Sequence, residues 1–236
     1  MNIYRTFSAA AFAVMCFAGS AHAITLSFAE FSSSSNDPAT GASGEVQLDF
    51  SAVDGIARVD VTVTNTTELT DFGSGATESQ LTGFGFDLLD GVAFAGMYVI
   101  GSFLDTTLLN ASFSPFGTLD LAFSDNGDFN GGNANSALPE GQSDMFSFAL
   151  TLGSFGTVAA LEAAFEAAFI EESLDAGMRF QQVNAGEGSD KLLFNPEVST
   201  VPLPAGLPLL LTCLAVTGIL ARRKGPSPAS AIAQPV

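Results

Sequence analysis

The sequence of 236 residues predicts a mainly β protein, an antiparallel β-sandwich with one short helix, followed by a single C-terminal transmembrane helix. Three patterns indicate this fold class. Short runs of alternating apolar and polar residues are separated by turns rich in Gly, Asn, Asp and Ser, as in sandwich domains. One segment changes to the helical period. One uncharged stretch near the C-terminus is long enough to cross a bilayer.

Residues 56–65 form the clearest predicted strand. Val59, Val61 and Val63 alternate there with polar residues, so one face of the strand is apolar. The Asp54-Gly55 pair before them is a strong signal for a two-residue hairpin turn. The pattern therefore predicts a hairpin that ends in this strand.

Residues 80–90 predict a strand of a different kind. Phe84, Phe86 and Leu88 lie on one face of this strand, and Gly83 and Gly85 alternate with the two phenylalanines on the other face. Small residues opposite bulky ones indicate that one side packs closely against another element. Further strands are predicted over residues 24–31, 45–50, 97–104, 107–113, 118–124, 138–152, 178–183 and 191–194.

Residues 158–170 change to a helical period. Leu161, Phe165 and Phe169 share one face with Val158, and glutamates lie on another face. Alanine, the best helix former, fills most of the remaining positions. The segment therefore predicts the one helix of this domain.

Residues 201–221 contain no charged side chain. At about 1.5 Å per helical residue they reach roughly 30 Å, the thickness of the hydrocarbon core of a bilayer. Prolines near the start of this stretch are tolerated in the first turn of a helix. Arg222, Arg223 and Lys224 follow directly, and such a basic cluster stops transfer and keeps its end in the cytoplasm.

A short proline-containing motif precedes the apolar residues of this span. Its five residues are Val201, Pro202, Leu203, Pro204 and Ala205. Together with the span and the basic cluster, the motif resembles the PEP-CTERM family of C-terminal sorting signals, in the VPLPA variant found in Gram-negative bacteria. Leu203 stands where the parent motif has Glu, as is normal for the variant, and residues 225–236 extend further than such signals usually do. The alternative is an ordinary single-span anchor that begins with prolines.

The resemblance implies a partner and a destination. The partner would be an exosortase, a membrane enzyme that recognises the motif and removes the span. The released domain is then expected at the cell surface or in the exopolysaccharide matrix. Stretches at 61–67, 81–87 and 138–148 also resemble parts of exported domains that carry such tails, although ordinary sandwich patterning explains them equally well.

The N-terminus has the pattern of a secretory signal peptide. Arg5 precedes an apolar run over residues 7–18, and Ala21 and Ala23 form a small-x-small cleavage site before Ile24. We therefore expect export, with the domain outside the cytoplasmic membrane. The predicted organisation is a signal peptide (1–23), a β-sandwich (24–194), a linker (195–200), the sorting signal (201–224) and a polar tail (225–236).

The composition of the exported segment excludes several classes of function. Its 25 acidic residues against three basic ones give residues 24–200 a net charge of −22, so nucleic acid is not expected as a partner. The chain's cysteines and its histidine, Cys16, Cys213 and His22, all lie outside this segment. A Ser-His-Asp or Cys-His apparatus and a zinc or copper site therefore lack their residues, and no enzyme is expected.

The loop over residues 125–135 is the one candidate metal site. Asp125, Asp128, Asn130 and Asn133 offer oxygen ligands, and the glycines allow tight turns. The spacing does not match the EF-hand pattern, and a plain hairpin loop explains the same composition. We therefore expect no cofactor, with calcium at these four residues as the alternative.

Polysaccharide binding is the alternative function in a different class. Sugar-binding platforms usually use Trp and Tyr, whereas the exported segment has no Trp and, among its tyrosines, Tyr98 alone. Its phenylalanines alternate as in a core. The sequence thus favours a non-enzymatic exported surface or matrix protein, with a polysaccharide- or calcium-binding module as the alternative.

Overall fold

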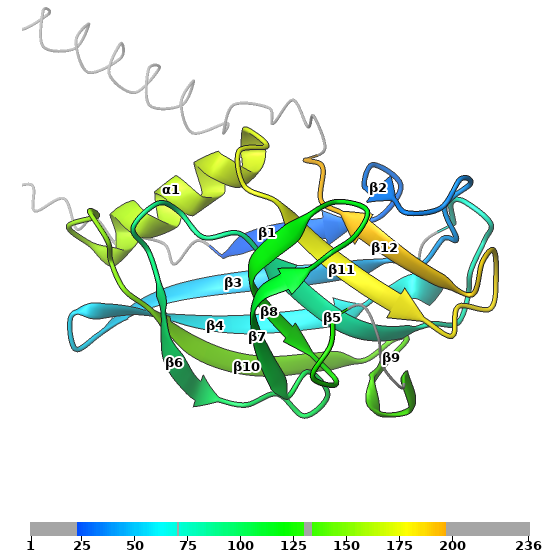
Figure 1. The fold of residues 1–236 in the computed structure, drawn as a ribbon, viewed down its shortest axis with the longest axis horizontal. Coiled ribbons are helices and arrows are strands. Elements are labelled where there is room, and N and C mark those ends of the chain that lie inside the picture. Colours follow the sequence, from blue (N-terminus) through cyan, green and yellow to red (C-terminus); the bar gives the residue numbers. More distant parts are fainter. Residues whose placement is uncertain (1–22, 70, 130–133, 197–236) are drawn as a thin grey trace, which may run out of the picture. The chain divides into compact units, whose positions relative to one another are not determined.

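Two antiparallel sheets face each other across a core rich in phenylalanine (Figure 1). The computed structural model describes residues 23–69, 71–129 and 134–196. The first sheet has the strand order β1-β3-β4-β10-β6 and the second the order β2-β12-β11-β5-β8-β7, with β9 paired to β5. The fold is therefore the antiparallel β-sandwich with one helix that the sequence predicts.

The strands of the first sheet are β1 (Ile24–Phe28), β3 (Gly44–Val53), β4 (Ile56–Asn65), β10 (Ser143–Leu150) and β6 (Phe94–Val99). Those of the second sheet are β2 (Ser33–Ser34), β12 (Ser189–Leu193), β11 (Ala176–Gln181), β5 (Gln80–Phe86), β8 (Thr118–Ser124), β7 (Thr106–Ser112) and β9 (Leu138–Pro139). Short 3₁₀ turns cover Thr67–Leu69 and Ala134–Ser136.

The predicted hairpin is confirmed. Strand β4 has the predicted bounds, and Val59, Val61 and Val63 are all buried. Asp54 and Gly55 adopt φ angles of 50° and 86°, the left-handed pair that a type I′ turn requires. The turn matches the twist of the strands, so β3 and β4 pair from one end to the other.

Several predicted strands have other bounds in the structure; the strand predicted over 80–90, for example, is β5 and ends at Phe86. Two predictions differ most from the observed strands. The strand predicted over 97–104 is β6, Phe94–Val99, because the N–H groups of Ser102, Phe103 and Leu104 donate to the carboxylate of Asp144 instead of to a neighbouring strand. The segment predicted over 138–152 is divided into β9 and β10 by a turn. Gly141, with φ of 71°, lies in that turn.

The helix α1 (Val158–Ile170) has the predicted bounds and buried face. The side chain of Thr157 caps its start by accepting from the N–H of Ala160 at 3.2 Å. Phe165 packs between the two sheets, with its ring 5.7 Å from Phe50 of β3 and 6.2 Å from Phe86 of β5. The helix thus closes one side of the sandwich, as Figure 1 shows.

The glycines of β5 allow close packing on the outer face of the second sheet. A Cβ at Gly85 would lie 2.7 Å from the Cβ of Ala122, and one at Gly83 would overlap the ring of Phe129. Phe129 comes from the loop after β8 and is 2% exposed, within a second small cluster that also contains Phe113. The expectation that one side of this strand packs closely is confirmed.

Candidate functional site

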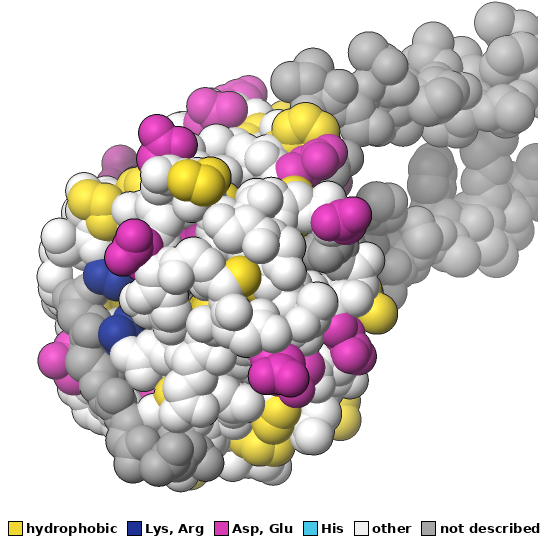
Figure 2. Space-filling model, turned by 90° about the vertical axis from the view of Figure 1, so that its right-hand side faces the viewer, with side chains coloured by type: hydrophobic (Ala, Val, Ile, Leu, Met, Phe, Trp, Pro, Cys, Tyr) yellow, Lys and Arg dark blue, Asp and Glu magenta, His cyan; other side chains and the backbone are white. Residues whose placement is uncertain are grey.

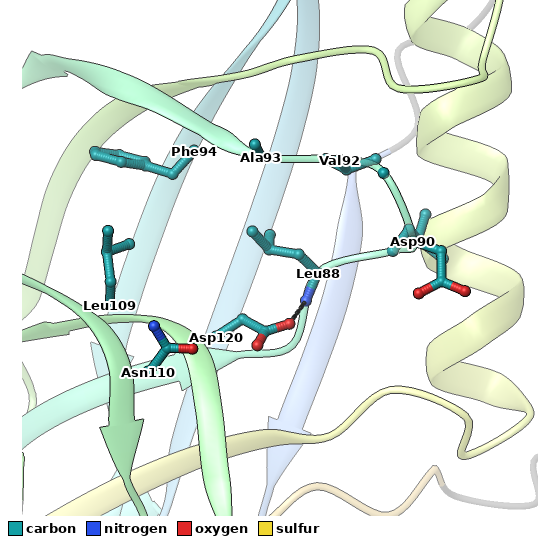
Figure 3. Close-up of a pocket in the computed structure, with 10 residues that line it drawn as sticks. Leu88, Asp90, Val92, Ala93, Phe94, Leu109, Asn110 and Asp120 are labelled. Carbon is teal, nitrogen blue, oxygen red and sulfur yellow. Dashed lines mark hydrogen bonds between the residues drawn. The ribbon is translucent and has the colours of Figure 1, made fainter.

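A hollow of about 390 Å³ opens between the edges of the two sheets. Phe94, at the start of edge strand β6, lines it from the first sheet. Asn110 of edge strand β7 and Asp120 of β8 line it from the second sheet. The remaining wall is the segment that crosses from β5 to β6 (Figure 3). We call this space the edge hollow, lined by residues 88–94, residues 109–110 and Asp120.

The crossing segment is fixed in place. The N–H of Val92 donates to the carbonyl of Leu89 at 2.9 Å, which closes a turn over Asp90 and Gly91. Thr151, just after β10, holds the next residue from both sides. Its N–H donates to the carbonyl of Ala93 at 2.9 Å, and its hydroxyl accepts from the N–H of Ala93 at 2.9 Å. This wall is therefore preformed.

Asn110 interrupts the pairing of β7 with β8. The pairs Leu109–Leu121 and Ala111–Leu119 are in register, and between them Asn110 has a φ of 52°. Asparagine is one of the few non-glycine residues that adopt this left-handed region readily. Among the described residues its carboxamide has no hydrogen-bond partner. The left-handed residue turns the backbone of β7 at this one position, beside the hollow.

Asp120 lies opposite Asn110 and is held on one side only. Its Oδ2 accepts from the N–H of Leu88 at 3.0 Å, and its own N–H donates to Oδ1 of Asp87 at 3.3 Å. Its Oδ1 has no hydrogen-bond partner within the described part of the chain. Asp120 therefore offers one carboxylate oxygen in a fixed position.

Phe94, Leu88 and Leu109 form apolar walls, while the side chains of Asn110 and Asp120 lie side by side at one end of the space (Figure 3). The side chain of Leu109 is 59% exposed. The lining thus combines apolar and polar groups, and slightly more polar than apolar surface faces the space.

The charge around the edge hollow is negative. Burial raises the pKa of Asp87, and the charges of Asp120 and Asp175 raise it further, whereas two backbone N–H groups lower it. Asp90 and Asp120 line the space, and no Lys or Arg lines it. The described residues contain no group of three or more His, Cys, Asp or Glu side chains that could hold a metal ion. The hollow therefore disfavours anions and suits a ligand that needs hydrogen-bond donors and acceptors.

The predicted calcium residues lie elsewhere, after β8. Asp125 is partly buried, and its Oδ2 has no hydrogen-bond partner among the described residues. Burial raises the pKa of Asp125, and the Arg179 guanidinium, which also attracts Asp128, lowers it by a smaller amount. Figure 2 shows Lys and Arg atoms close together on one side of the face it draws, beside acidic side chains. Asn130 and Asn133 lie outside the described residues, and calcium binding by this loop stays a prediction.

Tyr98 does not offer a free platform for a sugar. Its ring lies 5.4 Å from the guanidinium carbon of Arg58, and Arg58 forms an ion pair of 2.6 Å with Asp60. A shallow pocket of about 130 Å³ beside Met145 and Val99 adjoins this group on the outer face of the first sheet. One face of the tyrosine ring is thus occupied by a side chain of the protein itself.

Three polar groups in the interior have a structural role. Asn65 donates to the carbonyls of Ser79 and Leu138 at 3.1 and 3.0 Å, and its Oδ1 accepts from the hydroxyl of Thr67 at 2.8 Å. Asp144 accepts from the loop before β7, as described above. Asp190 accepts from Thr40 and from Ser34, and so ties the loop before β3 to β12.

Several of these contacts, and two close approaches at glycine, fall within the stretches 61–67, 81–87 and 138–148. Asn65 and Thr67 lie in the first, Gly83 and Gly85 in the second, and Asp144 in the third. Each makes a close contact or bond that holds the sandwich together. The stretches therefore encode the fold, and none of them lines the edge hollow.

The sequence prediction missed the edge hollow. A signal was present in an asparagine within the apolar run of residues 107–111. Asn110 interrupts that run, whereas Asp120 occupies an exposed position in the ordinary alternation of β8 and does not stand out. Only the pairing of β7 with β8 places them opposite each other.

The predicted processing sites lie at or beyond the ends of the described structure. Ala23 is described and Ile24 begins β1, whereas Ala21, the motif at 201–205 and the basic residues 222–224 lie outside the described residues. Within the described part of the chain no helix is long and apolar enough to cross a membrane. No protein-family model, curated protein or solved structure matches the chain.

Proposed function

We propose that the chain is a non-enzymatic exported protein whose β-sandwich is displayed outside the cytoplasmic membrane. An enzyme of the exosortase type processes it at residues 201–205 and releases the domain to the cell surface or the extracellular matrix. Its partners are then the membrane, this enzyme and the surrounding polysaccharide. The residues that carry this proposal are the signal peptide, the motif and the basic cluster described in the sequence.

One structural observation supports the proposal, namely the position of the two ends of the sandwich. Ile24 is the first residue of β1 and is 6% exposed, so the core begins where the signal peptide is predicted to end. At the other end the side chain of Asn195 donates to the carbonyl of Phe31 and to the hydroxyl of Ser33, both at 3.0 Å. Cleavage at both predicted sites removes no residue of the core.

The decisive experiment replaces Pro202 and Pro204 by Ala in the full chain, expressed in a host that has the sorting enzyme. The substitutions keep the span apolar and improve its helicity, because proline is the poorest helix former. A simple anchor would tolerate them. If residues 201–205 are a recognition motif, the parent loses its tail and leaves the membrane fraction, while the variant accumulates uncleaved.

Pro208→Ala is the matched control, because it removes a proline of the span outside the motif and should be processed like the parent. Mass spectrometry of the released protein should give Ile24 as its first residue, and Ala23→Leu should leave the precursor uncut. Equal amounts of full-length, membrane-held protein for the parent and the double-proline variant would refute the sorting proposal.

A further inference from the structure

We propose that the edge hollow binds one pyranose unit of a neutral saccharide, with the apolar face of the sugar against Phe94 and its hydroxyls on Asn110 and Asp120. This inference does not rest on the sorting proposal, because it concerns a site within the described domain. It places saccharide binding at Phe94, Asn110 and Asp120, whereas the sequence analysis considered only Trp and Tyr as sugar-binding residues.

The polar end of the hollow matches the chemistry of sugar hydroxyls. A hydroxyl both donates and accepts a hydrogen bond. The carboxylate of Asp120 can accept from it, and the carboxamide of Asn110 can donate to it and accept from it. Because Asp120 is tied to Leu88 through its other oxygen, the group is already oriented, which lowers the entropy cost of binding.

The apolar walls match the other part of a pyranose. Its C–H groups form an apolar face that packs against aromatic rings. Phe94 and Leu109 lie on one side of the hollow, across from the turn at Asp90 (Figure 3). The volume of about 390 Å³ is within the usual range for small-ligand sites of about 300–1,000 Å³.

Other ligand classes fit less well. An anion would face Asp90 and Asp120 with no Lys or Arg lining the space. A wholly apolar ligand would bury the polar groups of Asn110 and Asp120 without partners, which costs free energy. An organic cation would match the charge but would use only the carboxylates and the carboxamide oxygen, and not the donor groups of Asn110.

The position of the hollow also suits a unit within a longer chain. The hollow lies at the edge strands of both sheets, where no further strand covers it in the described structure. A polymer could therefore continue past the site on either side. A free sugar and a polysaccharide share the chemistry proposed here, so the test includes both.

The test measures binding by the full chain, purified in detergent, to defined probes. Calorimetric titration uses the methyl glycosides of glucose, galactose and mannose, and affinity electrophoresis uses dextran and galactomannan. Alginate, an anionic polyuronate, and butylamine, an organic cation, are the probes for competing classes. We expect binding of at least one neutral saccharide, and no binding of alginate or butylamine at the same concentrations.

Asn110→Gly is the central variant, because glycine keeps the backbone angle of 52° without strain and removes only the carboxamide. It should weaken saccharide binding by about tenfold, as expected for the loss of one or two hydrogen bonds. Asp120→Ala should weaken it at least as much. Tyr98→Ala is the matched control, since this exposed ring lies outside the hollow, and it should bind like the parent.

Several results would overturn the proposal. They are the absence of saccharide binding at tens of millimolar, preferential binding of alginate or butylamine, and unchanged binding by Asn110→Gly and Asp120→Ala. Loss of binding in Tyr98→Ala alone would place the site on the outer face of the first sheet instead. Binding of polymers together with the glycosides identifies a polysaccharide site, and binding of glycosides alone identifies a free-sugar site. Neither outcome depends on how the C-terminus is processed.

Discussion

The buried Asp144 and the exposed pair Asn110–Asp120 use similar side chains in opposite ways. The carboxylate of Asp144 is 3% exposed and accepts from the N–H groups of Ser102, Phe103 and Leu104 at 2.8 to 3.0 Å. Asn110 has no hydrogen-bond partner among the described residues, and Asp120 uses one oxygen only. A polar side chain whose bonding capacity is filled by the protein stabilises the fold. One that is held in place with capacity left over can bind a ligand.

The backbone around Asp144 and the backbone around Asn110 differ in a corresponding way. The loop at 101–104 wraps around the Asp144 carboxylate, and even a Cβ at Gly101 would lie 2.5 Å from its Oδ2. At Asn110 the ladder between β7 and β8 is interrupted in one place and resumes on both sides. The first arrangement is closed, whereas the second is open on the ligand side. The difference leads to three predictions about stability, given from the largest effect to the smallest.

Asp144→Ala should have the largest effect. It leaves the N–H groups of residues 102–104 without their acceptor, and each such group costs about 1–3 kcal/mol where it is buried. We expect a loss of more than about 3 kcal/mol in the free energy of unfolding, which lowers the Tm by roughly 10 °C in a domain of this size. Thermal unfolding followed by circular dichroism measures this change.

Asp120→Ala is the matched control for the exposed carboxylate. It removes one hydrogen bond at the surface and should lower stability by about 1 kcal/mol or less. Equal losses in the two variants would contradict the distinction between a closed and an open polar group.

The sequence was sufficient for the strands whose pattern is decided locally. The alternation in β4 and the Asp54-Gly55 turn depend on neighbours along the chain, and both were predicted with the observed bounds. The C-terminal end of β6 was not, because the chain after it is held by Asp144, whose carboxylate accepts from Ser102 more than forty positions away in sequence. A strand end that depends on a distant side chain leaves no mark in the local pattern.

The edge hollow could not be predicted from the sequence, for the same reason. Asn110 and Asp120 become neighbours through the pairing of β7 with β8, and Phe94 reaches them from the other sheet. Phenylalanine in alternating strands predicts a core, and most of these rings are indeed buried. Phe94 is partly buried and packs with its ring 6.2 Å from that of Phe148, so the sequence pattern alone does not distinguish it from a core residue.

Gly85→Ala tests the closed packing in a different way, with an intermediate effect. The added methyl would lie 2.7 Å from the Cβ of Ala122 and 2.9 Å from the carbonyl oxygen of Leu121. Since these neighbours belong to the paired strand, the sheet has to shift, at a typical cost of about 1–3 kcal/mol. A lower Tm at unchanged secondary structure is the expected result.

Gly156→Ala provides the control, because a methyl group at this position would have no neighbour within 4 Å and the φ of Gly156 is not left-handed. Its Tm should match that of the parent or exceed it slightly, since alanine restricts the unfolded chain. A tolerated Gly85→Ala would mean that β5 and β8 can shift relative to each other without cost.

The pH dependence of stability should show the smallest effect, and it concerns Asp87 behind the edge hollow. Burial and the nearby charges of Asp120 and Asp175 raise its pKa in the folded protein. The folded state then binds a proton more readily than the unfolded state, so the contribution of Asp87 to stability is present at acid pH and is lost as the pH rises through its folded pKa. On acidification from pH 7 towards pH 4, the Tm of the parent should therefore gain a contribution from this group. In Asp87→Asn that contribution is absent, and the rise in Tm should be smaller.

The general relief of repulsion among the acidic side chains acts on both proteins, so the comparison needs a control that removes one carboxylate elsewhere. Asp54→Asn serves this purpose, because Asp54 is exposed and asparagine accepts its left-handed turn conformation. If Asp87→Asn and Asp54→Asn gain the same Tm on acidification, the pKa of Asp87 is not raised in the folded protein, and burial does not disfavour its charged form.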